Sequence, residues 1–385
     1  MKKVVRFLSV LMGAILLASA FFGTLAAPVY PAEPDALSCI LMDADTGRVL
    51  YEKNADAALP PASVTKVMTM LLVFEAIDSG TLRLSDMITA SANAASMGGS
   101  QIYLKEGEQM SVDDLLKSLI VSSANDAAVA LAEAIAGSEM AFVVKMNERA
   151  AQLGMENTHF ENTNGLDDDT DTHLTSARDI AIMSREVLKH ELVFQYSPLW
   201  MDTIRGGEFG LTNTNRLVRF YDGATGLKTG STSKAKFCIS ATAERNGLSL
   251  IAVVMGSPTR DTRNALAASL LDFGFASFAH YEDNETAFEP VRVLGGVKNT
   301  VGAVQESFSQ TVEKAQSGKI EKRIDIPEVL TAPIAEGEKI GTVTYLLDGA
   351  EIGTADILAT EAVAKMDFRT LFPRLFAWFL LSEEK

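Results

Sequence analysis

Apolar and polar positions divide the chain into four stretches of different pattern. An apolar run extends from Phe7 to about Phe22. Short apolar runs, polar turns and longer helical stretches then share residues 33–277, whereas residues 284–363 hold alternating apolar runs with few helix signals. Residues 366–381 place apolar side chains at helical spacing. Because strands follow a period of two and helices a period of about 3.6, these patterns predict an α+β body, a small all-β domain and a terminal helix.

Strands are predicted at both ends of the body. Residues 37–52, LSCILMDADTGRVLYE, form two apolar runs around a polar turn, which is typical of a hairpin. Two later strands, KFCISATAE and LSLIAVVMG, are joined by turn residues 245–247. Because the segments between the two pairs have helical patterns, we predict one antiparallel sheet with an inserted helical lobe.

Capping residues and glycines mark the predicted helices. A helix is predicted over residues 63–80, preceded by two prolines and ended by a glycine. In the next helical region Ser111 and Asp114 resemble a capping box, and Ser138 opens a helix that ends near Gly154.

The terminal stretch is predicted to be an amphipathic helix. Its apolar face holds Phe368, Leu371, Phe372, Leu375, Trp378 and Phe379. Its polar face holds Asp367, Thr370, Pro373 and Arg374, with Arg369 at the border. The stretch is too short to span a bilayer, so it lies either at a membrane surface or docked on a core; the aromatic residues, arginines and terminal position favour the membrane surface.

The N-terminal 26 residues resemble a secretory signal. Lys2, Lys3 and Arg6 precede the apolar run, and small residues at positions 18 and 20, or 24 and 26, offer cleavage sites. The alternative is a retained membrane anchor. In both cases we expect the body to lie outside the cytoplasm, attached to the outer face of the cytoplasmic membrane through the terminal helix.

Charge and cysteine content narrow the function classes. The net charge of −16 argues against nucleic acid as a partner, because phosphates require clustered Lys and Arg. The two cysteines, Cys39 and Cys238, fall in predicted strands far apart in the sequence. Whether they meet is left open, but a core of this size folds without disulfides, which favours two unbridged, buried thiols.

Three short motifs suggest a common chemistry. Ser63 and Lys66 stand three residues apart, so they share one helix face and the hydroxyl can meet the base that it needs. Ser123-Ala124-Asn125 lies between two apolar helices, and Lys228-Thr229-Gly230 precedes apolar strands. Each motif alone has a simpler explanation: solvent-exposed residues on a helix for the first, a helix cap for the second and a β-turn for the third. The three motifs follow one another at spacings of about sixty and about a hundred residues, downstream of a predicted secretory leader. This combination strongly indicates one shared chemistry rather than three chance matches.

These motifs are those of the penicillin-recognising serine acyltransferases, and the chain resembles a low-molecular-mass penicillin-binding protein, a D-alanyl-D-alanine carboxypeptidase. Further matching stretches are LPPASVTKVMTMLL, AASMGGSQIYL, NTNGL, TSARDIA, TNTNRLV, GLKTGST and APIAEGEKIGTV. The resemblance implies a β-lactamase/transpeptidase-like serine peptidase domain over residues 33–277, followed by the β domain. Ala124 stands where glycine is also common in the family.

The resemblance also implies roles. Ser63 would attack the carbonyl between two D-alanines of a peptidoglycan stem peptide, and Lys66 would take its proton, which requires a lysine pKa lowered by burial and by the charge of Lys228. Ser123 would relay a proton to the leaving amine. Asn125 would hydrogen-bond the substrate amide and the lysine.

The third motif and its neighbour complete the implied substrate site. Lys228, Thr229, Gly230 and Ser231 would bind substrate, with Lys228, Thr229 and Ser231 holding the terminal carboxylate. The backbone N–H groups of Ser63 and Ser231 would form the oxyanion hole. Water would release the acyl-enzyme, but no residue identifies itself as the deacylation base. The resemblance implies no cofactor, and β-lactams are expected as covalent inhibitors.

Three other functions remain open at this point. A class A β-lactamase normally has aspartate in place of Ala124 and an E-x-x-L-N sequence, which HFENTNGLDDD lacks. A DD-endopeptidase differs only in what the pocket accepts beyond the scissile bond, and a slow penicillin-binding scaffold would retain the motifs. The acidic run 167–171 is spaced like a calcium loop but has Thr172 at the sixth position and Arg178 at the twelfth, so no metal is predicted.

Overall fold

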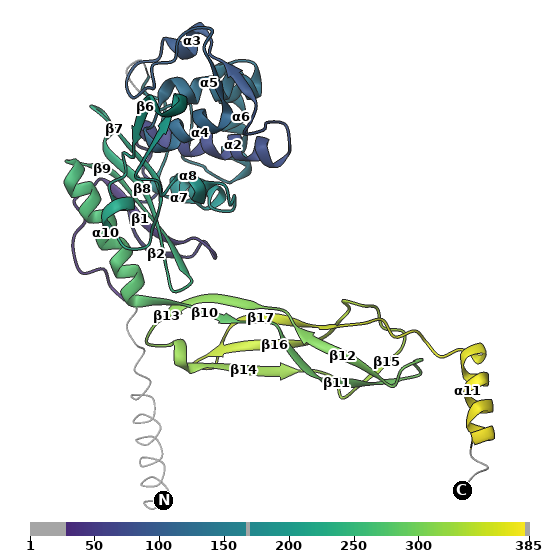
Figure 1. Cartoon of the computed structure of the whole chain (residues 1–385). Coiled ribbons are helices and arrows are strands. Elements are labelled where there is room, and N and C mark those ends of the chain that lie inside the picture. The colour runs from purple at the N-terminus through teal and green to yellow at the C-terminus, as the bar shows by residue number, and fades with distance from the viewer. Residues whose placement is uncertain (1–27, 167–169, 382–385) are drawn as a thin grey trace, which may run out of the picture. The chain divides into compact units, whose positions relative to one another are not determined.

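The computed structural model describes residues 28–166 and 170–381, with side chains to residue 377 (Figure 1). The predicted leader, residues 1–26, and part of the acidic run, residues 167–169, lie outside the described residues. The described residues from Glu33 onward belong to one unit of the chain.

The centre of the first half is a five-stranded antiparallel sheet with strand order β2-β1-β9-β8-β7. Its strands are β1 (Ser38–Asp43), β2 (Val49–Lys53), β7 (Ala224–Thr232), β8 (Lys236–Arg245) and β9 (Leu248–Ser257). The sheet thus joins strands from both ends of the body, and the predicted α+β fold with an inserted helical lobe is confirmed. The predicted turn between β8 and β9 is also confirmed, because Asn246 and Gly247 both have positive φ, 52° and 75°.

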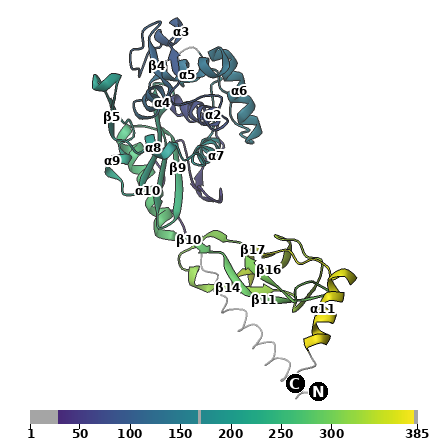
Figure 2. The ribbon, with the colours of Figure 1, turned by 45° about the vertical axis from the view of Figure 1, so that its right-hand side comes forward.

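Helices cover the two faces of this sheet (Figures 1 and 2). On one face α10 (Arg260–Ser277) packs closely: a Cβ at Gly274 would lie 2.5 Å from Leu250 Cδ1 and 3.1 Å from Leu41 Cδ2. Neighbouring residues Ile40 and Ile251 point to the other face and join the core of the helical lobe. This alternation is the strand period expected for a sheet buried on both sides.

The helical part consists of helices of different lengths. They are η1 (Ala62–Thr65), α2 (Lys66–Asp78), α3 (Ala92–Ala95), α4 (Val112–Val121), α5 (Asn125–Ala136), α6 (Glu139–Gln152), α7 (Ala177–Val187), α8 (Val193–Tyr196), η2 (Arg205–Gly207) and α9 (Leu217–Phe220). Two small hairpins, β3 (Met87–Thr89) with β4 (Gln109–Ser111) and β5 (Met201–Ile204) with β6 (Phe209–Thr212), lie among them. The predicted caps are confirmed: the Asp114 N–H donates to Ser111 Oγ and the Ala141 N–H to Ser138 Oγ.

The helix predicted over residues 63–80 differs in its first turn. Residues Ala62–Thr65 form a 3-10 turn, and the α-helix begins at Lys66. Side chains three residues apart eclipse one another in a 3-10 turn, so this geometry aligns Ser63 with Lys66 more closely than an α-helix does.

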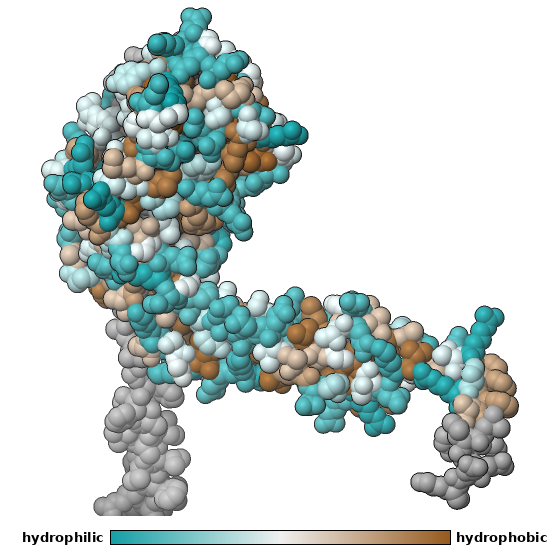
Figure 3. All heavy atoms as spheres, viewed as in Figure 1, coloured by the Kyte–Doolittle hydropathy of each residue, from teal (hydrophilic) through white to brown (hydrophobic). Residues whose placement is uncertain are grey.

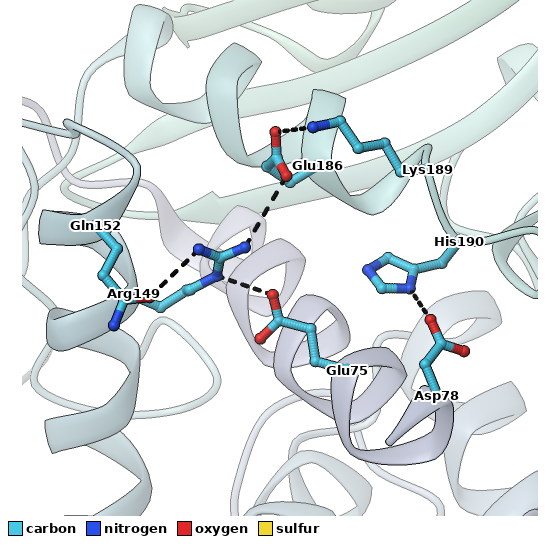
Figure 4. A network of polar contacts seen from close by, with 7 residues as sticks. All are labelled: Glu75, Asp78, Arg149, Gln152, Glu186, Lys189 and His190. Atoms are coloured by element: carbon cyan, nitrogen blue, oxygen red, sulfur yellow. Dashed lines mark hydrogen bonds and ion pairs between the residues drawn. The ribbon is translucent and has the colours of Figure 1, made fainter. Parts of the chain in front are cut away.

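A polar network ties α2 to its neighbours (Figure 4). Arg149 Nε lies 2.8 Å from Glu75 Oε1, and Arg149 Nη2 lies 3.9 Å from Glu186 Oε2, so one guanidinium joins α6, α2 and α7. His190 Nδ1 lies 2.5 Å from Asp78 Oδ2 at the end of α2. Because these pairs are partly exposed, each contributes only about 0–1 kcal/mol to stability, but together they restrict how α2 can shift.

The second half is the small β domain that the alternating pattern predicts. A six-stranded sheet has the order β14-β16-β17-β12-β11-β15, and β10 pairs with β13. Its elements are β10 (Phe278–Asp283), β11 (Thr286–Leu294), β12 (Thr300–Gln305), β13 (Phe308–Glu313), η3 (Ser317–Lys319), β14 (Ile320–Asp325), β15 (Val329–Thr331), β16 (Lys339–Leu347) and β17 (Ala350–Ala359). Val301, Val343, Tyr345 and Ile357 are fully buried in its core.

The terminal helix α11 spans Phe368–Leu381 and contains Pro373. Phe368, Phe372 and Phe376 stand in a row on it with ring centroids 5.7 Å and 6.4 Å apart, and all three are exposed. Exposed apolar side chains accordingly lie beside polar ones on the described surface of this helix (Figure 3). Within the described residues no single helix has the length and apolar character to cross a membrane; α5 and α6 reach that length only together, across a bend of 83°.

Cys39 and Cys238 form no disulfide and are both fully buried. The prediction of two unbridged, buried thiols is confirmed. Burial raises the pKa of the Cys39 thiol to about 11.

Candidate active site

The three motifs meet at one cavity of about 360 Å³ between β7 and the helical lobe. Ser63, Ser123, Thr229, Gly230 and Ser231 line it, and Lys66, Asn125 and Lys228 lie buried beside it. The rest of the wall consists of Ser100, Trp200, Asn213, Thr214, Arg216, Arg260 and Arg263. All eight residues proposed from the sequence therefore gather at this cavity.

Lys66 is bonded to the predicted nucleophile. Its Nζ lies 2.9 Å from Ser63 Oγ, 2.6 Å from Asn125 Oδ1 and 2.8 Å from the carbonyl oxygen of Asn164. The amide oxygen and the carbonyl can only accept, so Nζ donates to both. A neutral amine has two N–H groups and one lone pair, which leaves the lone pair to accept the Ser63 hydroxyl proton.

The surroundings of Lys66 favour this neutral form. Complete burial lowers the pKa of Lys66 well below its usual value, and the charge of Lys228 lowers it further. The nearby Asp126 opposes this shift, but its carboxylate accepts hydrogen bonds from the backbone N–H groups of Ile102 and Leu104.

Ser123 is placed by an uncommon backbone conformation. Its φ is +65°, and the residue is 3% exposed. In the described part of the chain its Oγ has no hydrogen-bond partner. A buried hydroxyl without a partner is destabilising, so its position on a cavity wall leaves it ready to bond with a ligand.

Asn125 is fixed through both ends of its amide. Its Oδ1 accepts from Lys66, and its Nδ2 donates to the carbonyl of Gly98 over 2.7 Å. A Cβ at Gly99 would come within 2.8 Å of Nδ2, so glycine is needed there for this close approach. The second N–H of the amide can still donate to a substrate.

The third motif brings buried positive charge to the cavity. Lys228 Nζ donates to the Thr229 carbonyl over 3.0 Å, and Thr229 Oγ1 donates to Thr214 Oγ1 over 2.7 Å. Burial, together with the charge of Arg263, lowers the pKa of Lys228 to about 7. An anion in the cavity would favour the charged form of this lysine.

Gly230 allows β7 to approach the start of the Ser63 turn. A Cβ on Gly230 would lie 2.8 Å from Ser63 N and 2.9 Å from both Val64 N and the Pro61 carbonyl. Any larger residue would push the strand away, so glycine keeps the backbone that follows it close to the Ser63 N–H.

The comparisons with known proteins agree with this geometry. The family model for D-alanyl-D-alanine carboxypeptidase matches residues 25–259. The chain belongs to this family. A second model, the C-terminal domain of penicillin-binding protein 5, matches residues 275–365.

Relatives in the D-alanyl-D-alanine carboxypeptidase family span most of the chain. The chain is 41% identical over 348 residues to the D-alanyl-D-alanine carboxypeptidase DacF of Bacillus subtilis, covering 88% of this chain and 89% of the relative. It resembles the crystal structure of penicillin-binding protein 5 from Haemophilus influenzae with a TM-score of 0.74 and 33% identity, covering 88% of this chain and all of that one. It also resembles penicillin-binding protein D2 of Listeria monocytogenes in its ampicillin-bound form, with a TM-score of 0.59 and 31% identity over 64% of this chain and 99% of that one.

Two contributions to the site were not predicted from the sequence. The Asn164 carbonyl accepts a hydrogen bond from Lys66, but the role of a backbone carbonyl cannot be recognised from the residue type. The NTNGL stretch, which matches the family, was the available signal. Arg263 lies in the first turns of α10 and is 3% exposed beside the cavity. Its distance of 35 residues from Lys228 in sequence gave no reason to place it there.

Proposed function

We propose that the protein is a serine-type D-Ala-D-Ala carboxypeptidase that removes the terminal D-alanine from peptidoglycan stem peptides through an acyl-enzyme on Ser63. The observation that carries the proposal is the 2.9 Å contact between Ser63 Oγ and a fully buried Lys66 whose pKa is lowered. A hydroxyl next to a neutral amine is an activated nucleophile.

Acylation would begin with attack of Ser63 Oγ on the carbonyl between the two D-alanines, while its proton passes to Lys66. The negative charge that develops on the carbonyl oxygen would be held by the N–H groups of Ser63 and Ser231. Preorganised donors of this kind are worth about a hundredfold to a thousandfold in rate each.

Collapse of the tetrahedral intermediate would break the C–N bond. The leaving amine would take its proton through Ser123, whose unpartnered hydroxyl is suited to a relay. Lys228, Thr229 and Ser231 would hold the carboxylate of the departing D-alanine, and the guanidinium of Arg263 adds a further positive charge. Water would then hydrolyse the ester, releasing the shortened peptide and restoring the serine hydroxyl.

Intact-mass analysis with peptide mapping after penicillin exposure tests this mechanism. We expect one covalent adduct on Ser63, no adduct in Ser63→Ala, and release of free D-alanine from a stem pentapeptide by the unmodified protein. An adduct on another residue would overturn the mechanism. Rapid hydrolysis of penicillin without D-alanine release would indicate a β-lactamase, and cleavage of crosslinked dimers alone would indicate an endopeptidase.

We further propose that the chain has two folded domains, the catalytic domain over residues 33–277 and a separate β domain over residues 284–363. Residues 1–26 would direct export. Residues 366–381 would attach the protein to a membrane surface. The exposed row of phenylalanines on α11 supports the attachment. Removal of residues 366–385 should move the exported protein from the membrane fraction to the soluble fraction. Retention after this deletion would instead indicate an uncleaved leader.

A further inference from the structure

A chain of buried hydrogen bonds leads to the peptide that precedes Ser63. The Glu161 N–H donates to His173 Nδ1 over 3.0 Å, and His173 Nε2 lies 2.7 Å from Thr65 Oγ1. Thr65 Oγ1 in turn donates to the carbonyl of Ala62 over 2.9 Å. Thr65 is fully buried and His173 is 2% exposed, so water does not compete for these bonds.

Only one arrangement of protons satisfies this chain. A carbonyl can only accept, so the single hydroxyl proton of Thr65 goes to Ala62. The Thr65 oxygen must then accept from Nε2–H of His173, while Nδ1 accepts from the backbone N–H of Glu161. His173 is therefore held as a neutral imidazole in one tautomer, as a fixed donor to Thr65.

The target of the chain is the peptide that supplies an oxyanion donor. The Ala62 carbonyl and the Ser63 N–H belong to one planar peptide, in which the two groups point in opposite directions. Fixing the carbonyl oxygen therefore also fixes the direction of the N–H. A hydrogen bond to the carbonyl further polarises the N–H, because bonds in series strengthen one another.

Two glycines leave this peptide little freedom to move. A Cβ at Gly165 would lie 1.9 Å from the Ala62 oxygen, and a Cβ at Gly230 would lie 2.8 Å from the Ser63 nitrogen. Ala62 itself has φ of +49°, a conformation that a residue with a side chain adopts only when its surroundings hold it. Thr65 is the side chain that bonds the oxygen side of this strained peptide.

We propose that Thr65 and His173 are positioning residues that aim and polarise the oxyanion-binding N–H of Ser63. The inference rests on the proposed acyl-enzyme mechanism. Thr65 acts through the Ala62 carbonyl, and His173 acts through Thr65 by holding its hydroxyl in the donating direction. Neither side chain is among the residues that line the cavity.

Substitutions at Thr65 test the first link. Thr65→Val keeps the shape of the side chain and removes the hydroxyl, whereas Thr65→Ser keeps the hydroxyl. Removal of a whole oxyanion donor typically reduces the rate by about a hundredfold or more, so loss of its support should reduce penicillin acylation and kcat on the order of tenfold. KM should change less than twofold in Thr65→Val, and Thr65→Ser should retain most of the activity.

A matched control lies one helical turn further on. Thr69 is also fully buried, and its Oγ1 donates to the Thr163 carbonyl over 2.6 Å, away from the Ala62 peptide. Thr69→Val should lower the melting temperature about as much as Thr65→Val while leaving kcat within twofold. An equal loss of kcat in Thr69→Val would mean that Thr65 contributes only general packing, and this result would overturn the proposal.

A second pair of variants tests the histidine. His173→Phe fills the same space without ring nitrogens, and His173→Gln places an amide N–H near the former Nε2 position. We expect the phenylalanine variant to lose activity as Thr65→Val does and the glutamine variant to recover most of it. This pair also decides the question if Thr65→Val does not fold.

A transition-state analogue separates positioning from stability. A peptidyl boronic acid becomes tetrahedral on Ser63 and needs the oxyanion donors, so its inhibition constant should rise about tenfold in Thr65→Val and stay unchanged in Thr69→Val. Equal boronate affinity in all folded variants would overturn the inference. Failure of the unsubstituted protein to form a Ser63 adduct would instead contradict the proposed function.

Discussion

The amine of Lys66 lies 2.9 Å from the hydroxyl of Ser63, and no water reaches it because the lysine is fully buried. Two of its three hydrogen-bond partners can only accept, so the third direction is open to the serine proton in the neutral form. The lowered pKa of Lys66 favours this neutral form.

Replacement of the base by a permanent cation should stop acylation. Lys66→Arg introduces a group that does not deprotonate, and a general base contributes about a hundredfold to ten-thousandfold in rate. We expect the rate of penicillin adduct formation, followed by intact mass, to fall at least a thousandfold. Lys66→Met should be equally inactive but better tolerated in the fold, because it removes a buried amine. An arginine variant that acylates within tenfold of the parent would mean that another group takes the proton.

Position 230, where β7 approaches Ser63 closely, should tolerate no side chain. Gly230→Ala would place a methyl group 2.8 Å from Ser63 N, so we expect a loss of kcat/KM of at least about a hundredfold, comparable to loss of an oxyanion donor. Gly210→Ala in β6 is the matched control, since a Cβ there meets nothing within 4 Å. D-alanine release assays on both variants, with circular dichroism to verify folding, distinguish local displacement from a general strand effect. Equal activity of the two variants would contradict the described packing.

Stability should depend on pH through Lys228. Its pKa is about 7 in the folded protein against 10.5 for an ordinary lysine, so between these values the unfolded chain binds more protons than the folded one. Stability should therefore rise with pH from about 7 to 10.5, by on the order of 5 kcal/mol at most. Below pH 7 the buried amine is charged, so its destabilising effect should be greatest there.

The variant Lys228→Met should weaken this dependence. We expect it to be more stable than the parent at pH 6, because replacing a buried charge by an apolar side chain of similar size is often stabilising, and to be nearly inactive. Urea unfolding at pH 6, 7, 8 and 9 measures the effect. Part of the rise should remain, since the pKa of Lys66 is also lowered. Parallel pH curves for the variant and the parent would rule out Lys228 as the source.

Substrate binding should take up a proton. At pH 8 most Lys228 side chains are neutral, and a carboxylate beside the amine would restore the charge. Calorimetry of a D-Ala-D-Ala peptide binding to Ser63→Ala, in buffers of different ionisation enthalpy, should show uptake that approaches one proton at most and falls towards zero below pH 6. Lys228→Met should show almost none. Absence of uptake in Ser63→Ala would mean that the carboxylate binds elsewhere.

The sequence revealed those parts of the site that depend on residue type and order. Ser63, Lys66 and Lys228 were recognisable because a serine and two lysines stand at spacings typical of the family. The sheet was predictable because its first and last strands carry strong apolar patterns. The role of the Asn164 carbonyl could not be predicted, because every residue has a backbone carbonyl. His173 was not singled out, because no motif in the sequence assigns it a role.

Conformations imposed by tertiary packing were equally hidden. The 3-10 turn at Ser63 begins at Ala62, whose positive φ no local propensity favours. Arg263 reaches the cavity because α10 folds back over the sheet that holds Lys228. The terminal helix was predicted from its period alone, and the structure places it at Phe368–Leu381.

Gly165 and Gly230 enclose one peptide so tightly that neither position can accept even a methyl group without moving the nucleophile. If β-lactams act on this protein as proposed, these two positions are closed to drug-resistance mutations, because any substitution that disturbs the inhibitor also disturbs the enzyme's own reaction. Resistance arising in this chain would then have to come from other parts of the wall, such as Trp200 and Arg216, which also line the cavity. Inhibitors that draw their affinity from the Ala62–Ser63 peptide would then be the hardest to escape.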